Sequence, residues 1–358
     1  MASAGAPPAA EDASPPLRIA LVAPVAQPVP PPKSGSIESL TAALANGLVA
    51  RGCDVTLFAT GGSSTRARLH AIYERGYLED STLWPWELCE LFNLSAALER
   101  AQSFDLIHYQ AEYAPLSLAY AGLSPVPLLQ TVHHLPSVPE VAQWARYPAA
   151  PFVAVSHEQA RALAGLNVIG TILHAVDTDA HAFQSRPDDY LLFLGRFTEG
   201  KGVLQAIEIA RRTGHRLLLA AAENDYYRTE VAPHVDGQTI VYVGEVHQAD
   251  KVALLGKARA LLYPVQSAES FGLVLAEAAS CGTPIAALRR GAVTDVVDEA
   301  TGEAFDTIDE LVAGIPRVLQ LDRAAVRARA VERFGLDRMV DAYLALYCGV
   351  AGRSGARP

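Results

Sequence analysis

The chain has 358 residues, and half of them are hydrophobic, so it is long enough for two domains that each bury a core. Its formal net charge of -10 excludes nucleic acid or an anionic membrane surface as the main partner, because both need a basic face. The four cysteines lack Cys-x2-Cys spacing, which excludes a zinc finger or a disulfide framework and indicates a cytoplasmic setting.

Residues 1–16 are rich in alanine and proline and have neither a basic start nor an apolar core, so we expect a disordered tail. A buried strand is expected over 17–23, a helix over 37–51 and a second strand over 54–60. This order predicts a parallel sheet. Gly35 lies just before the helix N-terminus, where anions bind, although an ordinary loop would also contain it.

Further strands are expected over 105–108, 126–132 and 152–156, and the middle one is followed by His133 and His134. A side chain at the carboxyl end of a strand lies where α/β sheets bind ligands, while a structural histidine is the plainer alternative. An apolar run over 168–173 then leads to Asp177 and Asp179. This Asp-x-Asp spacing is compatible with a Mg²⁺ site.

The second half begins with a buried strand over 190–194, then a glycine-rich loop and a helix over 203–212. The loop carries Arg196 and Lys201. A guanidinium and an ammonium at a helix start can hold a pyrophosphate, although such charges are more often solvated. Strands over 216–222 and 239–243 and a helix over 250–259 follow.

The most informative stretch runs over 261–297. A strand over 260–265 leads into a polar loop with Glu269, then a helix over 271–279 that carries Glu277. The backbone N–H groups that open this helix lack intrahelical partners and suit phosphate or ring oxygens, whereas the carboxylates suit sugar hydroxyls. A capped helix with one buried glutamate is the alternative. The amides belong to Phe271, Gly272 and Leu273.

The run from Glu269-Ser-Phe-Gly-Leu to Glu277-Ala, followed by Cys-Gly-Thr-Pro, resembles the E-x7-E signature of retaining GT-B glycosyltransferases of family 4. The resemblance covers about 17–347. It implies an α/β GT-B fold, in which two Rossmann-like parallel-sheet domains face each other across a cleft and a C-terminal helix crosses back. The implied domains are an acceptor domain over 17–172 with 335–358, and a donor domain over 173–334.

The resemblance also implies roles for single residues. Glu269 and His133 would act on the donor sugar at the reacting centre, and Glu277 would hold the ribose hydroxyls. In the glycine-rich loop near Gly35, Ser36 stands where the family has a second glycine. The residues implied to bind the donor are Gly35, Arg196, Lys201, Val246, Phe271, Gly272, Leu273 and Glu277.

The implied activity is a hexosyl transfer from a UDP- or GDP-linked sugar to a hydroxyl, with retention, no metal and no cofactor. Asp177 and Asp179 then belong to the interdomain crossing. No nucleophile is evident, so we expect attack assisted by the leaving group. Acidic residues outnumber basic ones over 17–170, which favours a soluble small-molecule or oligosaccharide acceptor over a lipid.

Two alternatives of the same fold stay open at this point. One is an epimerase or hydrolase of nucleotide-sugars, and the other is a binding protein without activity. A Rossmann dehydrogenase is disfavoured because no G-x-G-x-x-G follows the first strand.

Overall fold

The computed structural model describes residues 15–32, 35–111 and 115–352, so nearly all of the expected N-terminal tail lies outside the described residues. The first half forms a parallel seven-stranded sheet in the order β3-β2-β1-β4-β5-β6-β7. Its strands are β1 (Arg18–Val22), β2 (Asp54–Phe58), β3 (Arg68–His70), β4 (Leu106–Tyr109), β5 (Leu128–Thr131), β6 (Pro151–Ala154) and β7 (Asn167–Thr171).

The interior strand β1 shows why this sheet is buried on both faces. Ile19 and Leu21 belong to one hydrophobic cluster, and Ala20 and Val22 belong to another. Alternate side chains of a strand point to opposite faces, so an unbroken apolar run needs a cover on each side. The cover comes from helices α1 (Ser36–Ala50), α2 (Trp86–Leu98), α3 (Pro115–Ala121), α4 (Val138–Trp144) and α5 (His157–Ala162).

The second half forms a parallel six-stranded sheet in the order β10-β9-β8-β11-β12-β13. Its strands are β8 (Leu191–Leu194), β9 (Leu217–Ala220), β10 (Ile240–Gly244), β11 (Ala260–Tyr263), β12 (Ile285–Leu288) and β13 (Gly302–Phe305). Its helices include α6 (Val203–Thr213), α7 (Gln248–Lys257), α8 (Leu273–Ser280), α9 (Val293–Val296) and α10 (Ile308–Val318).

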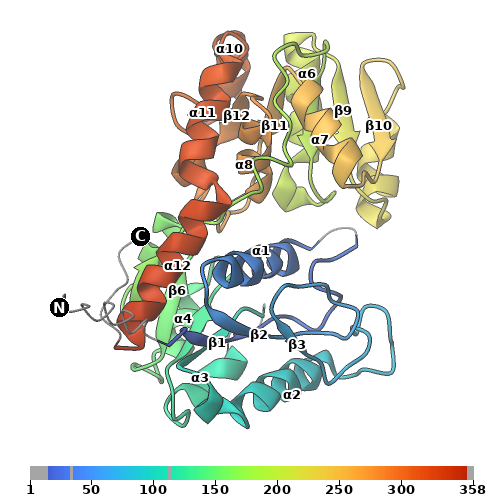
Figure 1. Ribbon diagram of the computed structural model, residues 1–358. Coiled ribbons are helices and arrows are strands. Elements are labelled where there is room, and N and C mark those ends of the chain that lie inside the picture. Colours follow the sequence, from blue (N-terminus) through green and yellow to red (C-terminus); the bar gives the residue numbers. More distant parts are fainter. Residues whose placement is uncertain (1–14, 33–34, 112–114, 353–358) are drawn as a thin grey trace, which may run out of the picture.

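The last two helices, α11 (Arg323–Phe334) and α12 (Leu336–Val350), connect the halves of the molecule. In Figure 1, α11 lies beside the second sheet and α12 continues down along the first. Tyr343 and Tyr347 of α12 are buried in the same cluster as Leu44 of α1. At the surface, Arg51 pairs with Asp337 at 2.9 Å. The predicted α/β class, with two parallel sheets and a returning C-terminal helix, is therefore confirmed.

Strand β13 was not predicted, and its first residue, Gly302, pairs with Ile285. A Cβ on Gly302 would lie 2.2 Å from the Ile285 carbonyl oxygen, so glycine is required by close strand packing. Helix α10 was not predicted at all. No helix in the described part of the chain is long and apolar enough to cross a membrane.

Candidate active site

Two loops leave the carboxyl ends of the neighbouring strands β8 and β11 and pack against each other. The Gly200 carbonyl accepts hydrogen bonds from the backbone N–H groups of Gln266 (2.8 Å) and Ser267 (3.2 Å). Gly202 has a φ of 76°, and a Cβ there would lie 1.9 Å from the Pro264 carbonyl oxygen. Only glycine lets the two backbones approach this closely. The contact brings the two predicted charge-bearing loops together.

The loop contact places Lys201 directly against Glu269. The Lys201 ammonium donates to Oε1 of Glu269, and the two side chains are 23% and 11% exposed. Nζ of Lys201 also lies 5.9 Å from the ring centroid of Tyr263, at the end of β11. Burial and the neighbouring Glu269 carboxylate raise the pKa of the Tyr263 hydroxyl well above its usual value, so it stays protonated.

The backbone of Glu269 is held by the segment that contains Gly291 and Ala292. The N–H of Ala292 donates to the Glu269 carbonyl (2.9 Å), and Gly291 forms a bridge with Glu269. Gly291 has a φ of 57°, and a Cβ there would lie 2.4 Å from the Glu269 carbonyl oxygen. This segment therefore fixes the backbone that carries the Glu269 carboxylate. Sequence reasoning did not assign it this task.

Helix α8 starts two residues later than expected, at Leu273. Gly272 is its N-cap with a φ of 84°, and the buried Phe271 precedes the helix. Within the described residues, the N–H groups of Phe271, Gly272 and Leu273 donate to no other group. Three backbone donors at a helix N-terminus are thus available for an anion or a hydroxyl oxygen, as the sequence predicted.

Glu277 is paired with a residue that sequence reasoning missed. Nζ of Lys251, in the first turn of α7, donates to Oε1 of Glu277 at 2.7 Å, and the side chains are 22% and 17% exposed. A cation at a helix N-terminus opposes the helix dipole, so the position is unfavourable for α7 by itself. The partner carboxylate on α8 compensates for that cost.

The junction between the two halves brings His133 to the start of α8. The Ser270 hydroxyl donates to the His133 carbonyl (2.9 Å). The ring of His133 stacks on His174, with centroids 5.3 Å apart and planes 14° apart. His174 in turn meets the edge of Phe271 at 5.3 Å. Residues from both halves, 138 positions apart at the ends of this column, therefore share one site.

The histidines at this junction are neutral at physiological pH. Burial and the nearby His134 lower the pKa of His133 to about 3. Burial and His133 lower the pKa of His174 well below its usual value. Burial also lowers the pKa of His108, which lies on β4, to about 3. Neutral imidazoles can both donate and accept hydrogen bonds, but they add no positive charge to the site.

The buried His108 leads to a prediction about acid stability. Its pKa is about 3 in the folded protein and about 6.5 when unfolded, so between these values the unfolded chain binds more protons. Stability from this group is present above pH 6.5 and is lost as pH falls. Between pH 7 and pH 5, the unfolding free energy of the wild type should fall by about 2 kcal/mol more than that of His108→Gln, as measured by urea titration.

His157→Gln, a change at an exposed histidine, is the matched control for this measurement. It should follow the wild-type pH dependence. Parallel pH profiles for wild type and His108→Gln would show that His108 is not held neutral by burial.

The other residues that the sequence analysis singled out take no part in these contacts. Arg196 is exposed and has no ion pair or hydrogen bond with any residue of the described chain. Gly35 precedes α1, and a Cβ there would lie 2.4 Å from Nε2 of Gln27. Val246, after β10, packs against the core of the second half. The Asp177 carboxylate accepts from the N–H groups of Asp179 (3.1 Å) and Ala180 (3.0 Å), which is the geometry of a turn.

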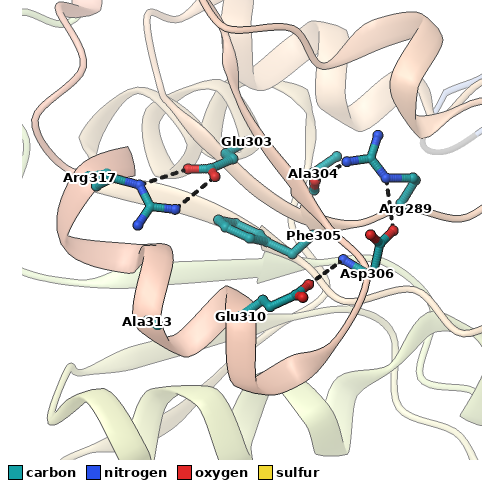
Figure 2. Close-up of a pocket in the computed structure, with 8 residues that line it drawn as sticks. All are labelled: Arg289, Glu303, Ala304, Phe305, Asp306, Glu310, Ala313 and Arg317. Carbon is teal, nitrogen blue, oxygen red and sulfur yellow. Dashed lines mark hydrogen bonds and ion pairs between the residues drawn. The ribbon is translucent and has the colours of Figure 1, made fainter.

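A separate hollow of about 350 Å³ lies at the outer strand β13 and helix α10 (Figure 2). Its charged side chains neutralise one another: Arg317 pairs with Glu303 (2.8 Å) and Arg289 with Asp306 (2.9 Å). Oε2 of Glu310 accepts from the N–H of Asp306 (3.1 Å). Paired surface charges explain this hollow without a ligand, and it contains none of the predicted site residues.

Two known families match parts of the chain. The family described as "Glycosyl transferases group 1" matches residues 177–333, and "Glycosyltransferase Family 4" matches residues 37–180. A phosphatidyl-myo-inositol mannosyltransferase from Mycobacterium tuberculosis (strain ATCC 25618 / H37Rv) is 29% identical over 214 residues, which are 52% of this chain and 55% of that protein. The chain thus spans about half the length of the curated relatives it matches.

Solved structures share the fold over nearly the whole chain. AviGT4, a glycosyltransferase involved in avilamycin A biosynthesis, superposes with a TM-score of 0.72 at 24% identity and covers 95% of this chain and 99% of its own. Anabaena HepE in complex with UDP and glucose gives a TM-score of 0.69 at 14% identity and covers 93% and 100%. At these identities, the similarity shows a common architecture.

Proposed function

Because the chain belongs to the GT-B glycosyltransferases of family 4, we propose that it transfers a hexose from a nucleotide-sugar to a hydroxyl group of an acceptor. The observation that carries this proposal is the contact between Lys201 and Glu269, beside three free backbone amides at the start of α8. The site then combines three kinds of group. A cation can bind the diphosphate, a carboxylate can accept hydrogen bonds from sugar hydroxyls, and backbone amides can donate to oxygens.

The free protein holds Lys201 on Glu269, and a donor would change this arrangement. The diphosphate carries more negative charge than one carboxylate, so it would attract the Lys201 ammonium. Arg196, which has no partner in the described chain, is available for the same diphosphate. Glu269 would then be released to accept hydrogen bonds from hydroxyls of the sugar.

The transfer step needs no protein nucleophile. The bond between the anomeric carbon and the diphosphate oxygen breaks, and its electron pair stays on the diphosphate. The acceptor oxygen forms the new bond on the same face, which gives retention, and the acceptor proton passes to the departing phosphate oxygen. Lys201 and Arg196 stabilise the growing charge of the leaving group. The Asp177 carboxylate is engaged by backbone amides, so we assign no metal to it.

The test is incubation with a panel of UDP- and GDP-linked hexoses, with and without small hydroxylated acceptors and oligosaccharides. We expect nucleotide release that depends on the acceptor and continues in EDTA. Release without acceptor would support a hydrolase, and no release from any donor would contradict catalysis. The four cysteines are free thiols, which is consistent with the cytoplasmic location that we also propose.

A further inference from the structure

Asp295 is a charged side chain that the mechanism above does not use, and it connects the two halves of the molecule. It lies on the short helix α9 of the second half and is partly exposed. Its Oδ2 accepts a hydrogen bond from the backbone N–H of Glu158 at 2.9 Å. Glu158 belongs to α5 of the first half, 137 positions earlier in the chain. The contact therefore depends on how the two halves are placed against each other.

On the side of the second half, Asp295 belongs to the segment that holds Glu269. The N–H of Ala292 donates to the Glu269 carbonyl, and the N–H of Asp295 donates to the Ala292 carbonyl, both at 2.9 Å. The carbonyl of Asp295 accepts from the Arg333 guanidinium on α11 at 2.6 Å. The backbone of this segment is thus fixed within the second half without the Asp295 carboxylate, which bonds to the other half.

On the side of the first half, the start of α5 is connected to the end of β5. Gln159 follows Glu158 and is fully buried. Its Nε2 donates to the carbonyls of Val132 and His134, both at 2.8 Å. These two residues are the neighbours of His133 in the chain. A contact that fixes the start of α5 therefore also fixes the backbone on both sides of His133.

We propose that Asp295 is a positioning residue that holds His133 of the first half in register with Glu269 of the second half. A carboxylate suits this task, because N–H groups in the first turn of a helix lack intrahelical acceptors and bond more strongly to a charged acceptor than to a neutral one. The hydrogen bond from Ser270 to the His133 carbonyl, at 2.9 Å, connects the halves at the start of α8. Asp295 adds a connection at α9. The inference rests on the proposed transferase function.

The decisive variant is Asp295→Ala, which removes the carboxylate and keeps the backbone that Arg333 holds. The loops and helix α8 that we propose to bind the donor all lie in the second half, so UDP and GDP should bind within twofold of wild type in calorimetry. We expect kcat to fall about tenfold and the KM of the acceptor to rise, because the groups of the two halves lose their register. Asp295→Asn keeps an oxygen acceptor and should recover most of kcat.

The contact itself is measured by hydrogen–deuterium exchange. In Asp295→Ala the Glu158 amide loses its acceptor and should exchange about tenfold faster than in the wild type. Asp306→Ala is the matched control. It changes an exposed aspartate of the same half that pairs with Arg289 at 2.9 Å, and it should leave both kcat and the exchange of the Glu158 amide unchanged.

The outcomes separate this inference from the proposed function. Equal losses of nucleotide affinity and kcat would show that Asp295 supports the second half alone. Unchanged kcat with faster exchange would show a connection that takes no part in the reaction. Either result would overturn the positioning role and leave the transferase proposal intact, whereas a wild type that turns over no donor would overturn both.

Discussion

Replacement of Glu269 by glutamine is expected to lower kcat by about 10²–10³-fold while changing donor affinity little. Glutamine keeps the size of the side chain and removes the negative charge that faces Lys201. The negative charge stabilises the transition state most, because positive charge develops on the sugar as the leaving group departs. The unpaired Lys201 remains free for the diphosphate, so binding of the ground state is maintained. Steady-state kinetics and calorimetry measure the two effects separately.

Glu277→Ala provides the contrast to this prediction. If Glu277 holds the ribose, its loss should weaken the donor and its nucleotide alike, with a smaller effect on kcat. Glu299→Gln, a change at an exposed glutamate, is the matched control for charge. Equal losses in kcat and affinity for both Glu269→Gln and Glu277→Ala would contradict the division of roles between the two carboxylates.

The parts of this site that could be predicted are those whose residues lie close together in the sequence. The buried strand, the loop with Glu269 and the helix with Glu277 follow each other within residues 260–280, and apolar runs reveal the strands. Helix α8 begins at Leu273, two residues later than expected, because Gly272 adopts a positive φ as its N-cap. Local patterns indicate such boundaries only approximately.

The parts that could not be predicted depend on contacts between distant segments. Lys251 and Glu277 lie 26 positions apart on two helices, and neither spacing nor composition pairs them. The Lys251 position in the first turn of a helix is the one local signal that could have drawn attention to it. Strand β3 was missed for another reason. Arg68 and Leu69 are exposed on an edge strand, so no apolar run marks it.

The other large effect is expected from Gly202→Ala, which acts on the contact between the two loops. The new Cβ would lie 1.9 Å from the Pro264 carbonyl oxygen, and neither this carbonyl nor the Cα that carries the Cβ can move without parting the loops. We expect a loss of about 2–4 kcal/mol of unfolding free energy in urea titrations. Because parting the loops moves Lys201 away from Glu269, kcat/KM should fall by about 10²-fold as well.

Gly214→Ala is the matched control because it shares the backbone strain without the collision. Gly214 also has a positive φ, 70°, but a Cβ there would meet no atom within 4 Å. Its cost should be confined to the strain of a left-handed alanine, about 1–2 kcal/mol, with kcat/KM unchanged. The difference between the two variants therefore isolates the contact of Gly202 with Pro264. If Gly202→Ala kept full activity, the diphosphate-binding loop would not need to pack against the loop of Glu269, and the ion pair would lose its assigned place in catalysis.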